Sequence, residues 1–192
     1  MKLKNVITQV RMEISEVNNS KILLDTNILI YTQDPIFGNY VTDLLQQLVD
    51  NGNELIASNM AGFEILKKYS SDEELFEPLL NLLNETPRLS VNVAVLRCAG
   101  KISHHLYNPG DKNSYKRDND TIISATALIH DCHLLTVNVK DFKMPLWSIL
   151  ANSHFIFDKS DGGGKGVLNV FLLESRVSEV ESETGINLVA RE

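Results

Sequence analysis

The chain has 192 residues, of which 43% are hydrophobic, with 10 glycines and 5 prolines. This length and composition suit one globular domain with a sizeable core and exclude a disordered chain. The formal net charge of −7 argues against broad, nonspecific adhesion to nucleic acid, which needs a basic face. The apolar stretches are too short to cross a bilayer, and the first residues lack the apolar core of a signal peptide, so we expect a cytoplasmic protein.

The first part of the chain predicts a short strand and a helix, after a segment whose secondary structure the sequence leaves undecided. Residues 1–20 fit both an alternating strand and a helix, and periodicity does not decide between them. The sequence "KILL" at 21–24 predicts a buried parallel strand, and the turn-forming "DTN" follows it directly. Residues 39–52 have apolar side chains at spacings of three and four and end at a glycine, which predicts an amphipathic helix.

The middle of the chain continues the alternation of strands and helices. Residues 53–58 predict a second strand, and 59–70 a helix with Phe63 and either Ile65 or Leu66 packing inward. A further helix is expected over 71–85, because "SDEE" is a good N-cap with acids in the first turn. Residues 88–93 predict a third strand.

The following stretch predicts two more helices around a loop. The helix at 94–107 is followed by a polar, basic and turn-rich loop at 108–117. A helix at 118–132 begins at a cluster of acids and is rich in apolar residues. The strand at 133–138 comes directly after it.

The last elements complete an α/β pattern. A turn at 139–142 precedes a fifth strand at 153–158. Strands that alternate with helices predict an α/β fold, a three-layer α/β/α sandwich with a mainly parallel, Rossmann-like central sheet. We expect an N-terminal extension at 1–20, a central domain at 21–158, and a glycine-rich hinge with a C-terminal extension at 159–192.

Four acids fall at corresponding ends of these elements. Asp25 follows the first buried strand, Glu64 lies early in a helix, Asp120 opens another helix, and Asp141 follows the fourth strand. Ligands of open parallel sheets bind at the carboxyl ends of the strands, so we expect these carboxylates to converge. Converging carboxylates repel each other unless a cation neutralises them, and ligands that are all oxygen suit Mg²⁺ or Mn²⁺. The natural chemistry is hydrolysis of a phosphodiester by a metal-activated water.

Three stretches carry a family resemblance. "LLDTNILI", "FEIL" and "NDTIISATALIHDCHLLTVNVKDF" resemble the motifs of PIN-domain ribonucleases, especially the VapC-type toxins of prokaryotic toxin–antitoxin pairs. The resemblance covers about residues 22 to 157. It implies a PIN-like fold and a divalent-metal-dependent endoribonuclease. The implied cofactor is Mg²⁺ or Mn²⁺, and the implied partners are an RNA substrate, an antitoxin protein and a second copy of the chain in a homodimer, with no membrane.

The resemblance also assigns roles to residues. It implies that Asp25, Glu64, Asp120 and Asp141 are the catalytic and metal-binding residues. It implies further that Asn138 supports the site from the preceding turn and that Thr26 or Asn27 orients Asp25 or a water. Separately, four basic residues neighbour the acidic motifs in sequence and are candidates for contacts with substrate phosphates: Lys67, Lys116, Arg117 and Lys140.

Each feature also has a purely structural interpretation. Asp25 can form a turn with the backbone after the strand, and Glu64 can pair with Lys67 or Lys68 on its helix. Asp120 can cap its helix, as Asp118 can. The basic residues can belong to a solvated face of mixed charge. The two cysteines, Cys98 and Cys132, are expected to be reduced packing residues, since their spacing fits neither a zinc site nor a disulfide scaffold.

Three functions remain open at this stage. The terminal extensions and the loop at 106–117 are departures from the compact toxins, so an RNA-processing PIN nuclease, or one that acts on DNA, is an alternative within the enzyme class. A catalytically silent PIN fold that binds RNA or protein is the alternative from another class. The complete acidic set favours an enzyme, because a binding module has no need of mutually repelling carboxylates.

Overall fold

A computed structural model describes residues 7–106, 118–142, 146–158 and 165–189. One seven-stranded sheet lies at its centre. The strands are β1 (Ile7–Met12), β2 (Lys21–Leu24), β3 (Glu54–Ser58), β4 (Arg88–Leu89), β5 (His133–Thr136), β6 (Trp147–Asp158) and β7 (Lys165–Ser175). The α-helices are α1 (Thr26–Tyr31), α2 (Gly38–Asp50), α3 (Asn59–Tyr69), α4 (Glu73–Glu85), α5 (Val93–Leu106), α6 (Asp118–Ile129) and α7 (Val177–Thr184), with short 3-10 helices η1 (Ile14–Glu16) and η3 (Val139–Asp141).

The sheet combines a parallel part with an antiparallel part. Its strand order is β1-β6-β7-β5-β2-β3-β4. Strands β5, β2, β3 and β4 are parallel to one another. Strands β7, β6 and β1 extend the sheet from β5, and each of them is antiparallel to the strand before it. The predicted α/β fold is confirmed, and its parallel part is the one that the sequence indicated.

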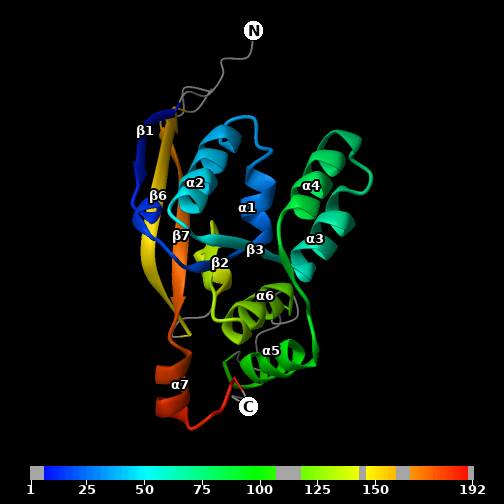
Figure 1. Ribbon diagram of the computed structural model, residues 1–192, viewed down its shortest axis with the longest axis vertical. Coiled ribbons are helices and arrows are strands. Elements are labelled where there is room, and N and C mark those ends of the chain that lie inside the picture. The colour runs from blue at the N-terminus through cyan, green and yellow to red at the C-terminus, as the bar shows by residue number, and fades with distance from the viewer. Residues whose placement is uncertain (1–6, 107–117, 143–145, 159–164, 190–192) are drawn as a thin grey trace.

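Two apolar cores give the fold its three layers. Successive side chains of a strand point to opposite faces, and Leu24 belongs to the core that α1 and α2 cover, while Leu23 belongs to the core under α5 and α6. The same alternation separates Leu135 from Leu134 in β5. Figure 1 shows α1 and α2 on one side of β2 and β3, and α5 and α6 on the other. Both faces of the parallel strands are therefore buried, which explains their continuous apolar sequences.

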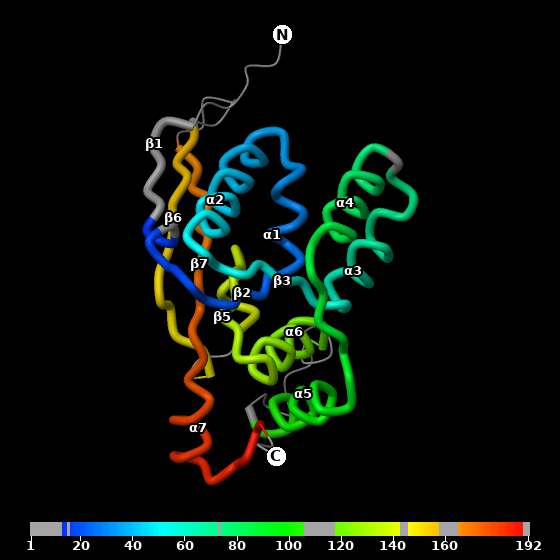
Figure 2. The backbone as a smooth tube through the Cα atoms, in the orientation of Figure 1, coloured from blue at the N-terminus to red at the C-terminus, as the bar shows by residue number. Residues whose placement is uncertain are grey.

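Both ends of the chain add strands to the sheet. Within the ambiguous N-terminal segment, Ile7–Met12 form strand β1, which pairs with β6 at the sheet edge, and the short 3-10 helix η1 follows. The expected C-terminal extension begins with β7, which lies between β6 and β5, as the trace in Figure 2 shows. The chain then returns through α7, and Leu188 is buried in the core under α5 and α6. The domain boundaries at 20 and 158 remain predictions, but the segments beyond them pair with the rest of the sheet.

Several element predictions need correction. The third strand has two residues, Arg88 and Leu89, instead of six, because it pairs only with the end of β3. The fifth strand begins at Trp147 instead of Ser153. Phe63 was expected to pack inward and is 53% exposed, whereas Ile65 is fully buried. The predicted glycine-rich hinge falls mainly on residues outside the described ranges.

The two cysteines fit the packing role expected of them. Cys98 and Cys132 are buried and free, and burial raises the pKa of each thiol to about 11. Such thiols stay protonated and unreactive near neutral pH. Within the described ranges, no helix is long and apolar enough to cross a membrane.

A buried polar contact joins the sheet to α6 and is testable. Trp147 of β6 is fully buried, and its indole Nε1 donates a hydrogen bond of 2.7 Å to Ser124 Oγ of α6. Ser124→Ala leaves the indole N–H unsatisfied, and we expect the free energy of unfolding to fall by about 1–3 kcal/mol. Trp147→Phe is expected to cost at least as much. Because both changes remove the same bond, the double variant should lose less than the sum, measured by urea unfolding followed by circular dichroism; additive losses would show that the bond contributes nothing.

Candidate active site

The candidate site lies where the parallel strands β2 and β5 end. Leu24 pairs with Leu135 in the register of these strands, so the next residues along each strand, Asp25 and Thr136, are neighbours at the carboxyl edge of the sheet. The backbone N–H of Asp25 donates to Leu135 O at 3.0 Å. This hydrogen bond continues the pairing of the strands by one residue and holds Asp25 at the edge.

Asp25 occupies the N-cap position of α1 without capping it. Its side chain makes no N-cap hydrogen bond, although that is the usual role of an aspartate there. Asp25 is 3% exposed, and its carboxylate is hydrogen-bonded by the backbone of Thr26 and by the side chains of Asn27 and Thr136. The contacts of Asp25 therefore extend beyond the local turn to β5.

Thr136 is the residue on which the contacts of Asp25 converge. Its hydroxyl donates to Asp25 Oδ2 at 2.7 Å and accepts from the backbone N–H of Asn138 at 2.9 Å. Asn27 Nδ2 donates to Asp25 Oδ2 and also contacts Thr136 Oγ1 at 3.3 Å. Asn27 Oδ1 accepts from the backbone N–H of Val137 at 3.2 Å. The asparagine thus ties α1 to the segment after β5 and fixes one carboxylate oxygen of Asp25.

Glu64 meets this cluster from α3. Thr26, the residue after Asp25, donates from its hydroxyl to Glu64 Oε2. Asn119 in the first turn of α6 donates to Glu64 Oε1 at 2.8 Å. Each carboxylate oxygen of Glu64 therefore accepts a hydrogen bond from a side chain of another helix. These contacts differ from the ion pair with a lysine on its own helix that the sequence also allowed.

Asp120 and Asp141 lie around this pair. Asp120 is half-buried in the first turn of α6 and follows Asn119, which binds Glu64. Asp141 ends η3, and Asn138 Nδ2 donates to Asp141 Oδ2. Asn138 also donates from its backbone to Thr136. The structure therefore joins Asp25 and Glu64 through adjacent residues, and it connects Asp141 to Asp25 through Asn138 and Thr136.

The electrostatics of Asp25 reflect its burial. The pKa of its carboxyl is raised from 3.8 to about 6, chiefly because burial desolvates the charged form, and the nearby negative charge of Glu64 contributes to the increase. The hydrogen bond from Thr136 acts in the opposite direction, since it stabilises the ionised form. Two carboxylates held together in this way favour the binding of a cation, which would remove the cost of ionising Asp25.

The donor set fits a weakly caged divalent cation. Among the residues that the structure describes, no group of three or more carboxylate, imidazole or thiol side chains is arranged to hold a metal ion. Mg²⁺ does not require such a cage, because it keeps several waters and is commonly bound by one or two carboxylates together with substrate phosphates. Asp25 and Glu64 meet that smaller requirement, and Asp120 and Asp141 stand on elements that border them.

The predicted basic residues divide into two groups. Lys67 on α3 and Lys140 on η3 are exposed, each on an element that carries one of the acids. Lys116 and Arg117 lie outside the described residues, as does most of the loop at 106–117. Contacts of these four residues with substrate phosphates stay a prediction.

Sequence reasoning missed two residues that hold the acids in place. Thr136 was seen only as part of a family-like stretch, and Asn119 only as part of an acidic cluster. The signal for Thr136 was its place, since it is the last residue of the strand next to Asp25. Asn119 carried no comparable signal, because its contact with Glu64 depends on how α3 and α6 pack.

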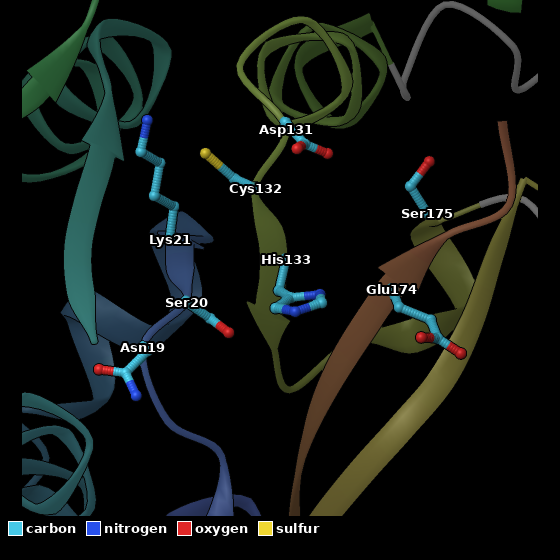
Figure 3. Close-up of a pocket in the computed structure, with 8 residues that line it drawn as sticks. All are labelled: Asn19, Ser20, Lys21, Asp131, Cys132, His133, Glu174 and Ser175. Carbon is cyan, nitrogen blue, oxygen red and sulfur yellow. The ribbon is translucent and has the colours of Figure 1, made fainter. Parts of the chain in front are cut away.

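A separate polar cavity lies at the opposite edge of the parallel strands. It has a volume of about 460 Å³ and is lined by residues at the start of β2 and β5 and the end of β7. Figure 3 shows Lys21, His133 and Glu174 around it, together with Asp131 at the end of α6. Its charges are mixed, and it lies away from the carboxyl edge that carries Asp25. The chemistry of the acids therefore does not extend to this cavity.

Comparison with known proteins places the chain in a family. The family model "PIN domain" matches residues 22–143. Ribonuclease VapC19 of Mycobacterium tuberculosis, in two strains, is 30% identical over 103 residues, which is 53% of this chain and 77% of the relative.

The fold is shared with a solved structure. A crystal structure of VapBC2 from Rickettsia felis, bound to a DNA fragment from its promoter, aligns with a TM-score of 0.52 at 20% identity, over 65% of this chain and 93% of that one. A toxin–antitoxin complex from Klebsiella pneumoniae gives 0.47 at 21% identity, over 65% and 92%. The family model spans more than half of the chain, and the matched range includes all four acids described above. The chain therefore belongs to the PIN domain family.

Proposed function

We propose that this protein is a divalent-metal-dependent endoribonuclease that hydrolyses RNA phosphodiester bonds. The observation that carries the proposal is the buried carboxylate of Asp25, held beside Glu64 at the carboxyl edge of the parallel strands. A folded protein gains nothing in stability from this arrangement, so it indicates a functional site. The similarity to a ribonuclease over 77% of that relative's length supports the choice of RNA as substrate.

Each side chain has a defined part in the proposed site. Asp25 and Glu64 hold Mg²⁺ or Mn²⁺, and Asp120 and Asp141 complete the site from α6 and η3. The bound cation would neutralise charge on the phosphate and lower the pKa of water, so that water is the nucleophile. Thr136 and Asn27 fix Asp25, Thr26 and Asn119 fix Glu64, and Asn138 fixes Asp141. Lys67 and Lys140 are placed to contact RNA phosphates at the rim.

The acids should be required for cleavage, and a neighbouring acid should not. We expect purified protein to cleave a mixed pool of structured RNA with Mg²⁺ or Mn²⁺, and Asp25→Asn and Asp120→Asn to lower the rate at least about 100-fold, since even partners of metal ligands cost 10- to 100-fold. Asp118→Asn is the matched control, because Asp118 is exposed in the same helical turn as Asp120.

The outcome also separates the enzyme from a silent binding module. Undiminished RNA binding with no cleavage under either metal would support the binding module and contradict the nuclease. Equal losses in the Asp118 and Asp120 variants would show that general charge, and not the proposed site, governs the activity.

The stability of the protein should depend on the charge of Asp25. Its pKa is raised on folding, so the folded state binds the proton more tightly, and the free energy of unfolding falls as pH rises from about 3.8 to about 6. Above that range, in EDTA, we expect Asp25→Asn to be more stable than the wild type by roughly 1–3 kcal/mol, at 1.36 kcal/mol per pKa unit.

Addition of Mg²⁺ provides the complementary measurement. Thermal unfolding should shift upward for the wild type and for Asp118→Asn, because the cation binds only the folded site, and it should shift much less for Asp25→Asn. An Asp25→Asn variant that is less stable than the wild type in EDTA, with an unchanged response to Mg²⁺, would contradict the proposed role of this carboxylate.

A cellular role as the toxin of a toxin–antitoxin pair follows from the same proposal. It is supported by the similarity to VapC19 and by the fold shared with VapBC2. Expression of the protein in a bacterial host should arrest growth, and the Asp25→Asn variant, at equal abundance, should not. Where a small antitoxin gene lies next to the gene of this protein, its co-expression should restore growth. Arrest by both forms, or none by either, would favour an RNA-processing nuclease or another role.

A further inference from the structure

A cleft of about 400 Å³ opens directly beside the candidate active site. Asn27, which binds Asp25 on one side, also lines this cleft on the other. The rest of its wall comes from the end of α1, the segment that follows it, and α3 and α4. Its volume lies in the range of small-molecule sites, and its interior is apolar with a few polar groups. The cleft and the cluster around Asp25 therefore share one residue, Asn27.

Two tyrosines give the cleft aromatic walls. Tyr31 is half-buried, and its ring packs edge-on against Phe37, with 6.0 Å between centroids and 71° between planes. Phe37 is itself held edge-on against Phe157 of β6 at 5.0 Å. Tyr69, at the end of α3, is half-buried and also lines the cleft, as do Leu75 and Leu79 of α4. The aromatic surfaces are therefore supported from behind by the core.

Charged groups are placed at the same cleft. The Nζ atom of Lys68 lies 5.0 Å from the centre of the Tyr69 ring, which is within the range of a cation–π contact. Asp34 Oδ1 accepts from the backbone N–H groups of Ile36 at 2.8 Å and Phe37 at 2.9 Å. This carboxylate fixes the segment after α1, so the cleft is shaped before any ligand binds. A cation beside an aromatic wall suits a ligand that has both a planar ring and a phosphate.

We propose that this cleft binds an unpaired base of the RNA, adjacent to the phosphodiester that is cleaved. The proposal rests on the proposed ribonuclease function. Unpaired bases stack on aromatic side chains, and their neighbouring phosphates contact lysines. Because Asn27 borders both the acids and the cleft, a phosphate at the acids and a base between Tyr31 and Tyr69 belong to the same short stretch of chain. Lys68 contacts the phosphate on the far side of that base.

The direct test removes the bases and leaves the protein unchanged. The full-length Asp25→Asn variant, which holds RNA without cutting it, is titrated against a fluorescein-labelled, random-sequence RNA of about ten nucleotides and against an abasic ribose-phosphate chain of equal length. We expect the Kd to be about 5- to 100-fold higher for the abasic chain, which keeps every phosphate. Equal affinities would overturn the proposal.

Protein variants locate the effect in the cleft. In the same background, Tyr69→Ala should raise the Kd for the RNA about 5- to 100-fold and leave the Kd for the abasic chain unchanged, whereas Tyr69→Phe, which keeps the ring, should restore binding. Tyr40→Ala is the matched control, because Tyr40 is a half-buried tyrosine that packs on Phe155 outside the cleft. Lys68→Ala should weaken the binding of both the RNA and the abasic chain. It should also reduce the salt dependence of binding by the amount expected for about one phosphate contact.

The results distinguish this proposal from the proposed function. RNA cleavage by the wild type, with base-independent binding, would overturn the base site and leave the nuclease intact. Base-dependent binding that Tyr69→Ala abolishes, without any cleavage, would support the base site and overturn the nuclease. If Tyr69→Ala leaves RNA binding unchanged and weakens only the complex with the neighbouring small protein, the cleft is a peptide site and the proposal is wrong.

Discussion

The arrangement of this protein around its site depends on one costly feature, a carboxylate buried to 3% exposure at the end of a strand. Burial raises the pKa of Asp25, and Glu64 adds to the effect. A charged group in such a place is tolerated only when it is hydrogen-bonded or neutralised. Thr136 and Asn27 supply the hydrogen bonds, and a bound cation supplies the neutralisation in the proposed function. Much of the local structure is explained by these two needs.

The parallel part of the sheet is what makes the cluster geometrically possible. Because β2 and β5 run side by side in the same direction, their last residues meet at one edge, and the helices that follow or precede them start or end there. Asp25 precedes α1, and Asn119 lies in the first turn of α6, whereas Glu64 lies in the middle of α3 and not early in it as expected. Three helices therefore contribute to the same place. The antiparallel strands β7 and β6 extend the core beyond that edge and carry Trp147 to α6.

The sequence allowed the parallel part of the sheet to be predicted better than the antiparallel part. The buried strand before Asp25, the helix that begins near Asp120 and the acids at corresponding ends were all visible, because parallel strands and amphipathic helices have local periodicities. The position of β7 was not, since an antiparallel pairing between β5 and β6 depends on contacts remote in sequence. Phe63 shows another limit. Its helix has apolar residues on more than one face, and the pattern did not reveal which of them the fold covers.

The hydrogen-bonding residues were harder to predict than the acids, for a physical reason. A carboxylate after an apolar run stands out as costly, whereas a threonine or asparagine in a turn is ordinary until its partner is known. The resemblance named Asn27 but did not reveal its contacts. It binds Asp25, accepts from the backbone N–H of Val137 and also lines the aromatic cleft. In the proposed mechanism, a base bound in that cleft would lie against the residue that holds the Asp25 carboxylate. Asn27 would then connect recognition of the RNA to its cleavage.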